Sequence, residues 1–217
     1  LSDTVSYRTC EMSTDPDAAV LAIIDRQKRV LVCKRAEHLR LHPGEACLAG
    51  GKREEGDSSL VETALREAQE EIGVDRELIT IQYELEPVSS LGGLWVHPVV
   101  GTVAEEPELS INTNEVAKTE WIPLENFLKN ENHWDVLNGN YNVHVFEFPE
   151  LRVFGLTATL CILIAIKELE MAPAYDLNTD LTAGVMQSLT PSEILTRFYD
   201  YYYEKVRPRE SRETAKM

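Results

Sequence analysis

The spacing of apolar and polar residues predicts a chain of short strands with two substantial helices. Runs of apolar and β-branched residues, typical of strands, occupy residues 17–25, 29–35, 79–85, 94–103 and 141–149. Helices are expected at 58–72 and 155–170, and residues 118–130 predict a strand that leads into a short helix. The first two strands are separated by a short polar segment, which indicates a hairpin or adjacent strands. Together these elements predict an α/β fold, an α/β/α sandwich around a mixed β-sheet.

Turn-forming and capping residues mark the ends of the first helix. The segment from Leu39 to Gly56 is rich in Gly and Pro, so we expect a loop there. Ser58 or Ser59 is placed to cap the start of the helix, and Gly73 is placed to end it.

The C-terminal part of the chain is less regular than the rest. Residues 191–206 predict one further helix, whose tyrosines either pack in the core or contact a partner, and the polar residues after it predict a mobile tail. The expected organisation is therefore a domain over residues 1–178 and a C-terminal extension over residues 179–217.

The composition indicates one globular unit with an acidic surface. Of 217 residues, 43% are hydrophobic and 27% charged, with a formal net charge of −16, which allows one well-buried core. That charge argues against general binding to nucleic acid or to anionic membranes, since both need basic patches. The most apolar run, at 153–166, is shorter than the roughly 20 residues that span a bilayer, so we expect a buried helix.

The cysteines form no recognisable metal or redox motif. Cys10, Cys33, Cys47 and Cys161 are scattered, with no CxxC pair and no Cys/His cluster at zinc spacing. We expect reduced thiols, in the core or near the surface of an intracellular protein.

The first predicted helix gathers three carboxylates. Glu67, Glu70 and Glu71 share one face, because positions i, i+3 and i+4 are neighbours on a helix. Two interpretations stay open for these mutually repelling groups. One is a solvated acidic face, and the other is a site for Mg²⁺ or Mn²⁺, which prefer carboxylate oxygens.

The surrounding sequence, GGKREEGDSSLVETALREAQEEIGV at residues 50–74, resembles the Nudix box. In that family pattern, Gly is followed after five residues by Glu, and after seven more by Arg-Glu-hydrophobic-x-Glu-Glu-x-Gly-hydrophobic. The second half matches at every specified position from Arg66 to Val74. In the first half, Asp57 replaces Glu, and eight residues separate it from Arg66. Asp57 is therefore a candidate cap of the helix.

The resemblance implies the Nudix fold and metal-dependent hydrolysis of a diphosphate, with Mg²⁺ or Mn²⁺ as the cofactor. The expected metal ligands are Glu67, Glu70 and Glu71. Arg66 is expected to hold one of these glutamates by a bidentate ion pair. Gly51 is expected to form a turn that lets the loop backbone approach the site.

Two residues are candidates for the catalytic base. Residues 112–116 match an Asn-x-x-Glu-Val setting, in which the resemblance places a further active-site carboxylate, here Glu115. Glu115 is accordingly a candidate base or further metal ligand, and the alternative is a solvated loop residue. Glu70 is the other candidate base.

Residues 30–51 resemble the signature of the coenzyme A diphosphatases within the Nudix family. The residues at the expected spacing are Leu31, Arg35, Ala36, Arg40, Gly44, Gly50 and Gly51. Val32, Leu48 and Ala49 stand where that signature has Thr, Phe and Pro. The extra residue after Asp57 and the apolar helix after residue 153 are also similar to this subfamily, so the likeness covers roughly residues 15–178.

This second resemblance implies a small-molecule substrate, coenzyme A or acyl-coenzyme A, cut into 3′,5′-ADP and (acyl-)4′-phosphopantetheine. Arg35, Arg40, Lys52 and Arg53, with Gly51 in the same loop, are expected to bind its phosphates. One alternative is a Nudix hydrolase of ADP-ribose, a dinucleotide or an oxidised nucleoside triphosphate. Another is a nucleotide-binding module without turnover.

The last three residues, Ala215, Lys216 and Met217, resemble a relaxed peroxisomal import signal of the Ser-Lys-Leu type. They predict a peroxisomal import receptor as a partner and the peroxisome as the location, with the cytoplasm as the alternative.

Overall fold

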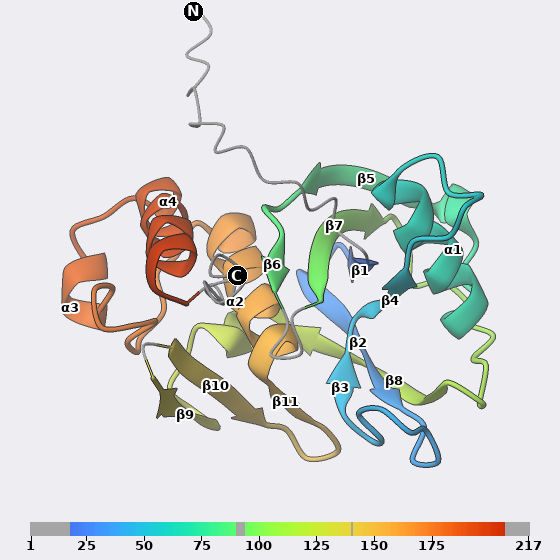
Figure 1. The fold of residues 1–217 in the computed structure, drawn as a ribbon, viewed down its shortest axis with the longest axis horizontal. Coiled ribbons are helices and arrows are strands. Elements are labelled where there is room, and N and C mark those ends of the chain that lie inside the picture. Colours follow the sequence, from blue (N-terminus) through green and yellow to red (C-terminus); the bar gives the residue numbers. More distant parts are fainter. Residues whose placement is uncertain (1–17, 90–93, 140, 207–217) are drawn as a thin grey trace, which may run out of the picture.

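The computed structural model of the protein describes residues 18–89, 94–139 and 141–206. These residues form two β-sheets with helices packed against them (Figure 1). The strands of the main sheet are β1 (Ala18–Ile24), β2 (Arg29–Arg35), β3 (Ala46–Cys47), β4 (Ala49–Lys52), β5 (Ile79–Glu84), β6 (Val88–Ser89), β7 (Trp95–Val103) and β8 (Val116–Pro123).

The main sheet is mixed, as predicted. Its path runs β3-β2-β1-β7-β5, with β4 paired to β1, β6 to β7 and β8 to β2. β1 and β7 run parallel, whereas β1 is antiparallel to β2 and to β4. β1 is apolar throughout because it is buried on both faces: Leu21 and Ile23 point into one core, and Ala22 and Ile24 into the other.

Helix α1 (Leu60–Ile72) covers one face of this sheet. The Ser59 side chain accepts from the Glu62 N–H at its start, and Gly73 ends it with a left-handed φ of 65°. Both capping predictions are confirmed. The buried side of α1 includes Ala64, Leu65 and Ala68, which pack with β1 and β2.

Helix α2 (Gly155–Leu169) covers the opposite face and is buried over most of its length, as the apolar run predicts (Figure 1). It also packs against a second sheet of β9 (His133–Asn138), β10 (Tyr141–Glu147) and β11 (Arg152–Phe154), in the order β11-β10-β9. The α/β/α sandwich with a mixed sheet is confirmed, and this second, three-stranded sheet was not predicted. β9 was not predicted, because it is exposed along nearly its whole length and lacks an alternating pattern.

Three further expectations need correction. The predicted loop from Leu39 to Gly56 contains β3 and β4, whose pairing with β2 and β1 is set by tertiary contacts. The short helix expected near the end of 118–130 is a 3-10 helix at Leu124–Phe127. A second 3-10 helix, Arg76–Leu78, follows α1.

The C-terminal segment adds α3 (Ala183–Met186), which was not predicted, and α4 (Pro191–Tyr201), which continues into a π-helical turn at Tyr202–Val206. Tyr201 and Tyr202 are buried, so core packing is the correct alternative for these two tyrosines. The predicted tail at 207–217 lies outside the described residues. In the part of the chain that the structure describes, no helix is both long and apolar enough to cross a membrane.

His144 ties β10 to the segment that leads into α3. The ring is 2% exposed. Its Nε2 lies 3.1 Å from the carbonyl oxygen of Leu177, and its Nδ1 lies 3.1 Å from Nε2 of His133. Burial, with a smaller contribution from His133, lowers the pKa of His144 to about 4. In its neutral form the His144 ring donates from Nε2 to the Leu177 carbonyl and accepts at Nδ1 from His133. A second proton, on Nδ1, would place this N–H against the N–H of His133.

We expect acid to weaken the fold through His144. Its pKa is about 4 in the folded chain and about 6.5 when unfolded, so the unfolded chain takes up the proton first as the pH falls. This contribution to stability is complete above about pH 6.5 and is lost between about pH 6.5 and 4. The loss amounts to roughly 3 kcal/mol.

Urea unfolding across this range should show a flatter pH profile for His144→Gln than for the native chain. The exposed residue His38 provides the control, and His38→Gln should keep the native profile. An unchanged slope in His144→Gln would contradict the assignment.

Candidate active site

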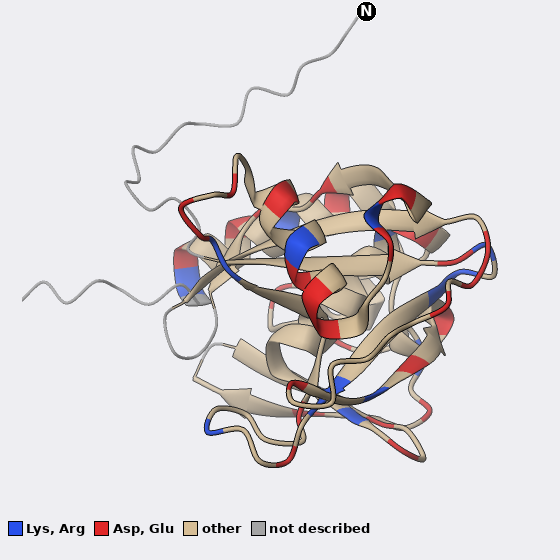
Figure 2. Ribbon diagram, turned by 90° about the vertical axis from the view of Figure 1, so that its right-hand side faces the viewer, with Lys and Arg blue, Asp and Glu red and all other residues tan. Residues whose placement is uncertain are grey.

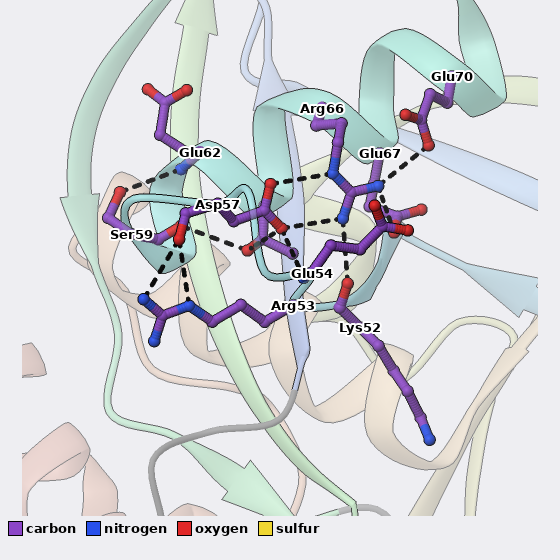
Figure 3. Close-up of polar contacts among 10 residues, drawn as sticks. Lys52, Arg53, Glu54, Asp57, Ser59, Glu62, Arg66, Glu67 and Glu70 are labelled. Atoms are coloured by element: carbon purple, nitrogen blue, oxygen red, sulfur yellow. Dashed lines mark hydrogen bonds and ion pairs between the residues drawn. The ribbon is translucent and has the colours of Figure 1, made fainter.

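Arg66 of α1 is the hub of a network of charged groups (Figure 3). Its Nε and Nη2 donate to the two carboxylate oxygens of Asp57, each at 3.0 Å. Nη1 donates at 3.0 Å to Glu67 and to Glu70, and Nη2 also donates at 3.0 Å to the Lys52 carbonyl. This bonding ties α1 to the end of β4 and to the loop between them.

Asp57 is buried and bonded on both of its oxygens. Besides Arg66, it accepts from the Thr63 hydroxyl and from the Glu54 N–H, both at 2.9 Å. The Arg66 guanidinium and these donors hold the pKa of the Asp57 carboxyl well below its usual range. Asp57 is thus charged and fixed.

These contacts correct two expectations. The bidentate partner of Arg66 is Asp57, and each glutamate receives only a single bond. Asp57 does not cap α1, because Ser59 occupies that position. Sequence reasoning missed the Asp57–Arg66 pair, although the altered spacing of the box had already singled out Asp57.

Glu71 is the most buried of the three helix carboxylates. It is 5% exposed, and it accepts from the Gly50 N–H at 3.2 Å. Burial raises its pKa to about 7; the Gly50 bond opposes this shift, and the nearby carboxylates of Glu67 and Glu115 add to it. Burial also raises the pKa of Glu67, against the effect of Arg66.

The loop before β8 brings Glu115 to these carboxylates. Its backbone binds the C-terminal end of α1, where the N–H of Ser110 donates to the Ile72 carbonyl and the N–H of Asn112 donates to the Glu71 carbonyl, both at 2.9 Å. Asn112 in turn accepts from the N–H of Glu115 at 2.9 Å. Glu115 therefore lies within electrostatic reach of Glu67 and Glu71.

The two glycines of β4 make room for different neighbours. A Cβ on Gly51 would lie 2.5 Å from a carboxylate oxygen of Glu67, whereas a Cβ on Gly50 would lie 2.3 Å from the Ala19 carbonyl oxygen in β1. Gly51 thus leaves space for the Glu67 carboxylate. Gly50 allows the backbone of β4 to approach β1.

The four basic residues expected to bind phosphate differ in how they lie relative to the carboxylates. Arg35 is close enough to Glu71 to lower its pKa, and its Nε lies 3.4 Å from the Leu41 carbonyl oxygen. Arg40 is exposed, and the side chain of Lys52 points away from the Arg66 network (Figure 3). Arg53 binds the Asp57 carbonyl at 3.3 and 3.4 Å, so it braces the loop.

The donor set fits a divalent cation. Figure 2 shows acidic segments on the side of the molecule that carries α1. In the described residues, no three His, Cys, Asp or Glu side chains are already gathered around one centre, since Glu67 and Glu70 both bond to Arg66. Their oxygens are nevertheless the hard ligands that Mg²⁺ and Mn²⁺ prefer. Burial, with smaller contributions from neighbouring carboxylates, raises the pKa of Glu67 and Glu71, and a bound cation would favour their charged forms.

The chain is similar in sequence to known proteins. The model of the NUDIX domain matches residues 14–138. A peroxisomal coenzyme A diphosphatase of Caenorhabditis elegans is 34% identical over 205 residues, 90% of this chain and 88% of that protein. Its counterpart from Mus musculus is 29% identical, covering 93% and 89%. Nudix hydrolase 15, mitochondrial, of Arabidopsis thaliana is 37% identical, covering 76% and 65%.

Solved structures resemble part of the chain. A Caenorhabditis elegans Ap4A hydrolase in a binary complex aligns with a TM-score of 0.43 and 19% identity, covering 50% of this chain and 80% of that one. A MutT protein from Methanosarcina mazei Go1 aligns with a TM-score of 0.41 and 27% identity, covering 51% and 78%.

We expect Gly50→Ala to destabilise the fold and Gly51→Ala to preserve it. At Gly50 the new methyl group would meet backbone atoms of β1, whereas at Gly51 its nearest neighbours are the carboxylate atoms at the end of the Glu67 side chain, which can turn aside. The melting temperature should fall by roughly 5 °C for Gly50→Ala. It should fall by less than about 2 °C for Gly51→Ala.

Gly56→Ala is the control, because a Cβ there meets nothing within 4 Å. Thermal unfolding by circular dichroism measures all three variants. Equal losses at Gly50 and Gly51 would contradict the assigned contacts.

Proposed function

The chain belongs to the Nudix family, and from that premise we propose that it hydrolyses the diphosphate bond of coenzyme A or acyl-coenzyme A. The products are 3′,5′-ADP and (acyl-)4′-phosphopantetheine. The observation that carries the proposal is the carboxylate cluster of Glu67, Glu71 and Glu115 beside Arg35. Similarity to two proteins named as coenzyme A diphosphatases along most of the chain supports this substrate class.

In this proposal Glu67, Glu70 and Glu71 hold Mg²⁺ or Mn²⁺. When bound, the cation supplies positive charge against the diphosphate oxygens and favours ionised water as the nucleophile. Arg66 orients Glu67 and Glu70 through Nη1, and Asp57 keeps Arg66 in place. Gly51 leaves the space that the Glu67 carboxylate occupies, so that it would be free to hold the cation.

Glu115 is the proposed base that takes the proton from the attacking water. The support is its fixed backbone and its closeness to Glu67 and Glu71. Glu70 is the alternative base, since its side chain is 56% exposed and meets Arg66 through one bond.

The separate phosphate of coenzyme A needs cations outside the carboxylate cluster. Arg35, Arg40 and Lys52 are the proposed partners, because they lie on or beside the strands that flank the site. One guanidinium group can donate to two phosphate oxygens at once, so the two arginines are better suited to this role than Lys52.

We also propose a peroxisomal location, which is supported by the names of the relatives from Caenorhabditis elegans and Mus musculus. Ala215, Lys216 and Met217, on which the predicted import signal rests, lie outside the described residues.

Glu70→Gln should lower kcat by roughly 10²–10⁴-fold with the fold retained, because it removes a charged ligand or base from an exposed position. Glu62→Gln is a matched control on the same helix, where Glu62 pairs with Arg76 instead. Steady-state hydrolysis assays and melting curves measure both variants. Full activity in Glu70→Gln would mean that the proposed cation site is wrong.

Product analysis tests the substrate. The protein is incubated with Mg²⁺ or Mn²⁺ and, separately, with coenzyme A, acetyl-coenzyme A, ADP-ribose, NADH or 8-oxo-dGTP. Mass spectrometry should detect 4′-phosphopantetheine and 3′,5′-ADP from coenzyme A, or acetyl-4′-phosphopantetheine from its acetyl ester, and a chelator should abolish both. Cleavage of another compound alone would retain the Nudix reaction and refute the coenzyme A assignment.

A further inference from the structure

Two cysteines stand opposite each other on neighbouring strands of the main sheet. Cys33 of β2 and Cys47 of β3 are directly paired across the antiparallel ladder. Opposed residues in such a ladder have Cα atoms about 4.5–5.5 Å apart, which falls within the range of about 4.4–6.8 Å found in disulfides. Both are free thiols.

The two thiols differ in their access to solvent. Cys33 is 1% exposed, whereas Cys47 is only partly buried, and both pack in the core beneath α1. A small oxidant therefore reaches Cys47 first, with Cys33 behind it. Cys161 is buried in the core on the α2 side of the sheet.

We propose that Cys33 and Cys47 form a reversible disulfide when the protein meets a peroxide. The Cys47 thiolate attacks the O–O bond of H₂O₂, so a sulfenic acid forms and one oxygen leaves as water after protonation. The Cys33 sulfur then attacks Sγ of Cys47. The S–S bond forms, the S–O bond breaks, and the hydroxyl group leaves as a second water with the proton of Cys33. The two thiols lose two electrons in total, which reduce one H₂O₂ to two waters.

The disulfide would act on the carboxylate site through β3 and β4. Gly50, three residues after Cys47, donates its N–H to Glu71, and Cys33 lies within electrostatic reach of the same carboxylate. An S–S bond of about 2.05 Å is shorter than any contact between two thiols. Closing it fixes β3 on β2 and so restrains the backbone that leads to Gly50. This part of the proposal rests on the proposed function. It predicts that oxidation lowers coenzyme A turnover by roughly tenfold.

Peptide mapping tests the disulfide without reference to activity. The full chain is treated with H₂O₂, free thiols are blocked with N-ethylmaleimide, and the digest is analysed by mass spectrometry with and without dithiothreitol. A peptide that joins Cys33 to Cys47 should appear and should vanish on reduction. It should be absent from Cys47→Ser and from Cys33→Val, and present in Cys161→Ala.

Melting curves establish that each variant is folded, and the partly exposed position of Cys47 makes Cys47→Ser the decisive one. A Cys47 oxidised to sulfinic acid, or linked to any cysteine other than Cys33, would overturn the proposal.

The turnover assay separates the disulfide from its effect on the site. Oxidised native protein should lose activity and regain it with dithiothreitol, whereas Cys47→Ser should be insensitive to H₂O₂. A disulfide that forms with unchanged turnover would overturn the coupling to Glu71. An inactive reduced protein would refute the proposed function, and the peptide map would still decide the thiol pair.

Discussion

The bidentate pair of Arg66 with Asp57 is the contact on which the site depends. A guanidinium is planar, so fixing Nε and Nη2 on one carboxylate also fixes the direction of Nη1, which donates to Glu67 and Glu70. Asp57 is itself held by a hydroxyl and a backbone N–H, and the Lys52 carbonyl binds the same guanidinium. The orientation of the glutamates is therefore determined by the loop that precedes α1 as well as by α1.

The three glutamates of α1 differ in how deeply they are buried, and therefore in how readily they carry charge. Glu70 has a largely exposed side chain, whereas Glu71, the next residue, is 5% exposed with its pKa raised to about 7. The interpretation as a solvated acidic face is therefore wrong for Glu71. Desolvation and the neighbouring carboxylates disfavour its charge, and a single N–H of Gly50 with the more distant Arg35 offsets only part of that. In the proposed function, a divalent cation held by Glu67, Glu70 and Glu71 would offset this unfavourable charge.

Local signals predicted α1, α2, α4 and the longer strands other than β9, and tertiary pairing explains why β4 and β9 were missed. Ser59 and Gly73 define α1 because capping needs only neighbouring residues. β4 is rich in glycine, and it becomes a strand because β1 lies beside it. β9 pairs with β10 while its side chains face solvent, so no apolar pattern marks it. The Asp57–Arg66 pair was missed for a similar reason, since spacing in the sequence does not reveal which carboxylate meets a given guanidinium.

The departures from the coenzyme A diphosphatase signature lie in the interior of the protein. Leu48, in place of Phe, is 3% exposed in the core on the α2 side, and Ala49, in place of Pro, is 2% exposed in the core on the α1 side. Both side chains are covered, so these positions contribute to the packing around β3 and β4 and not to the exposed surface. In the proposed function, exposed groups such as Arg40 and Lys52 would then select the substrate. The core residues affect it only through the position they give to β4.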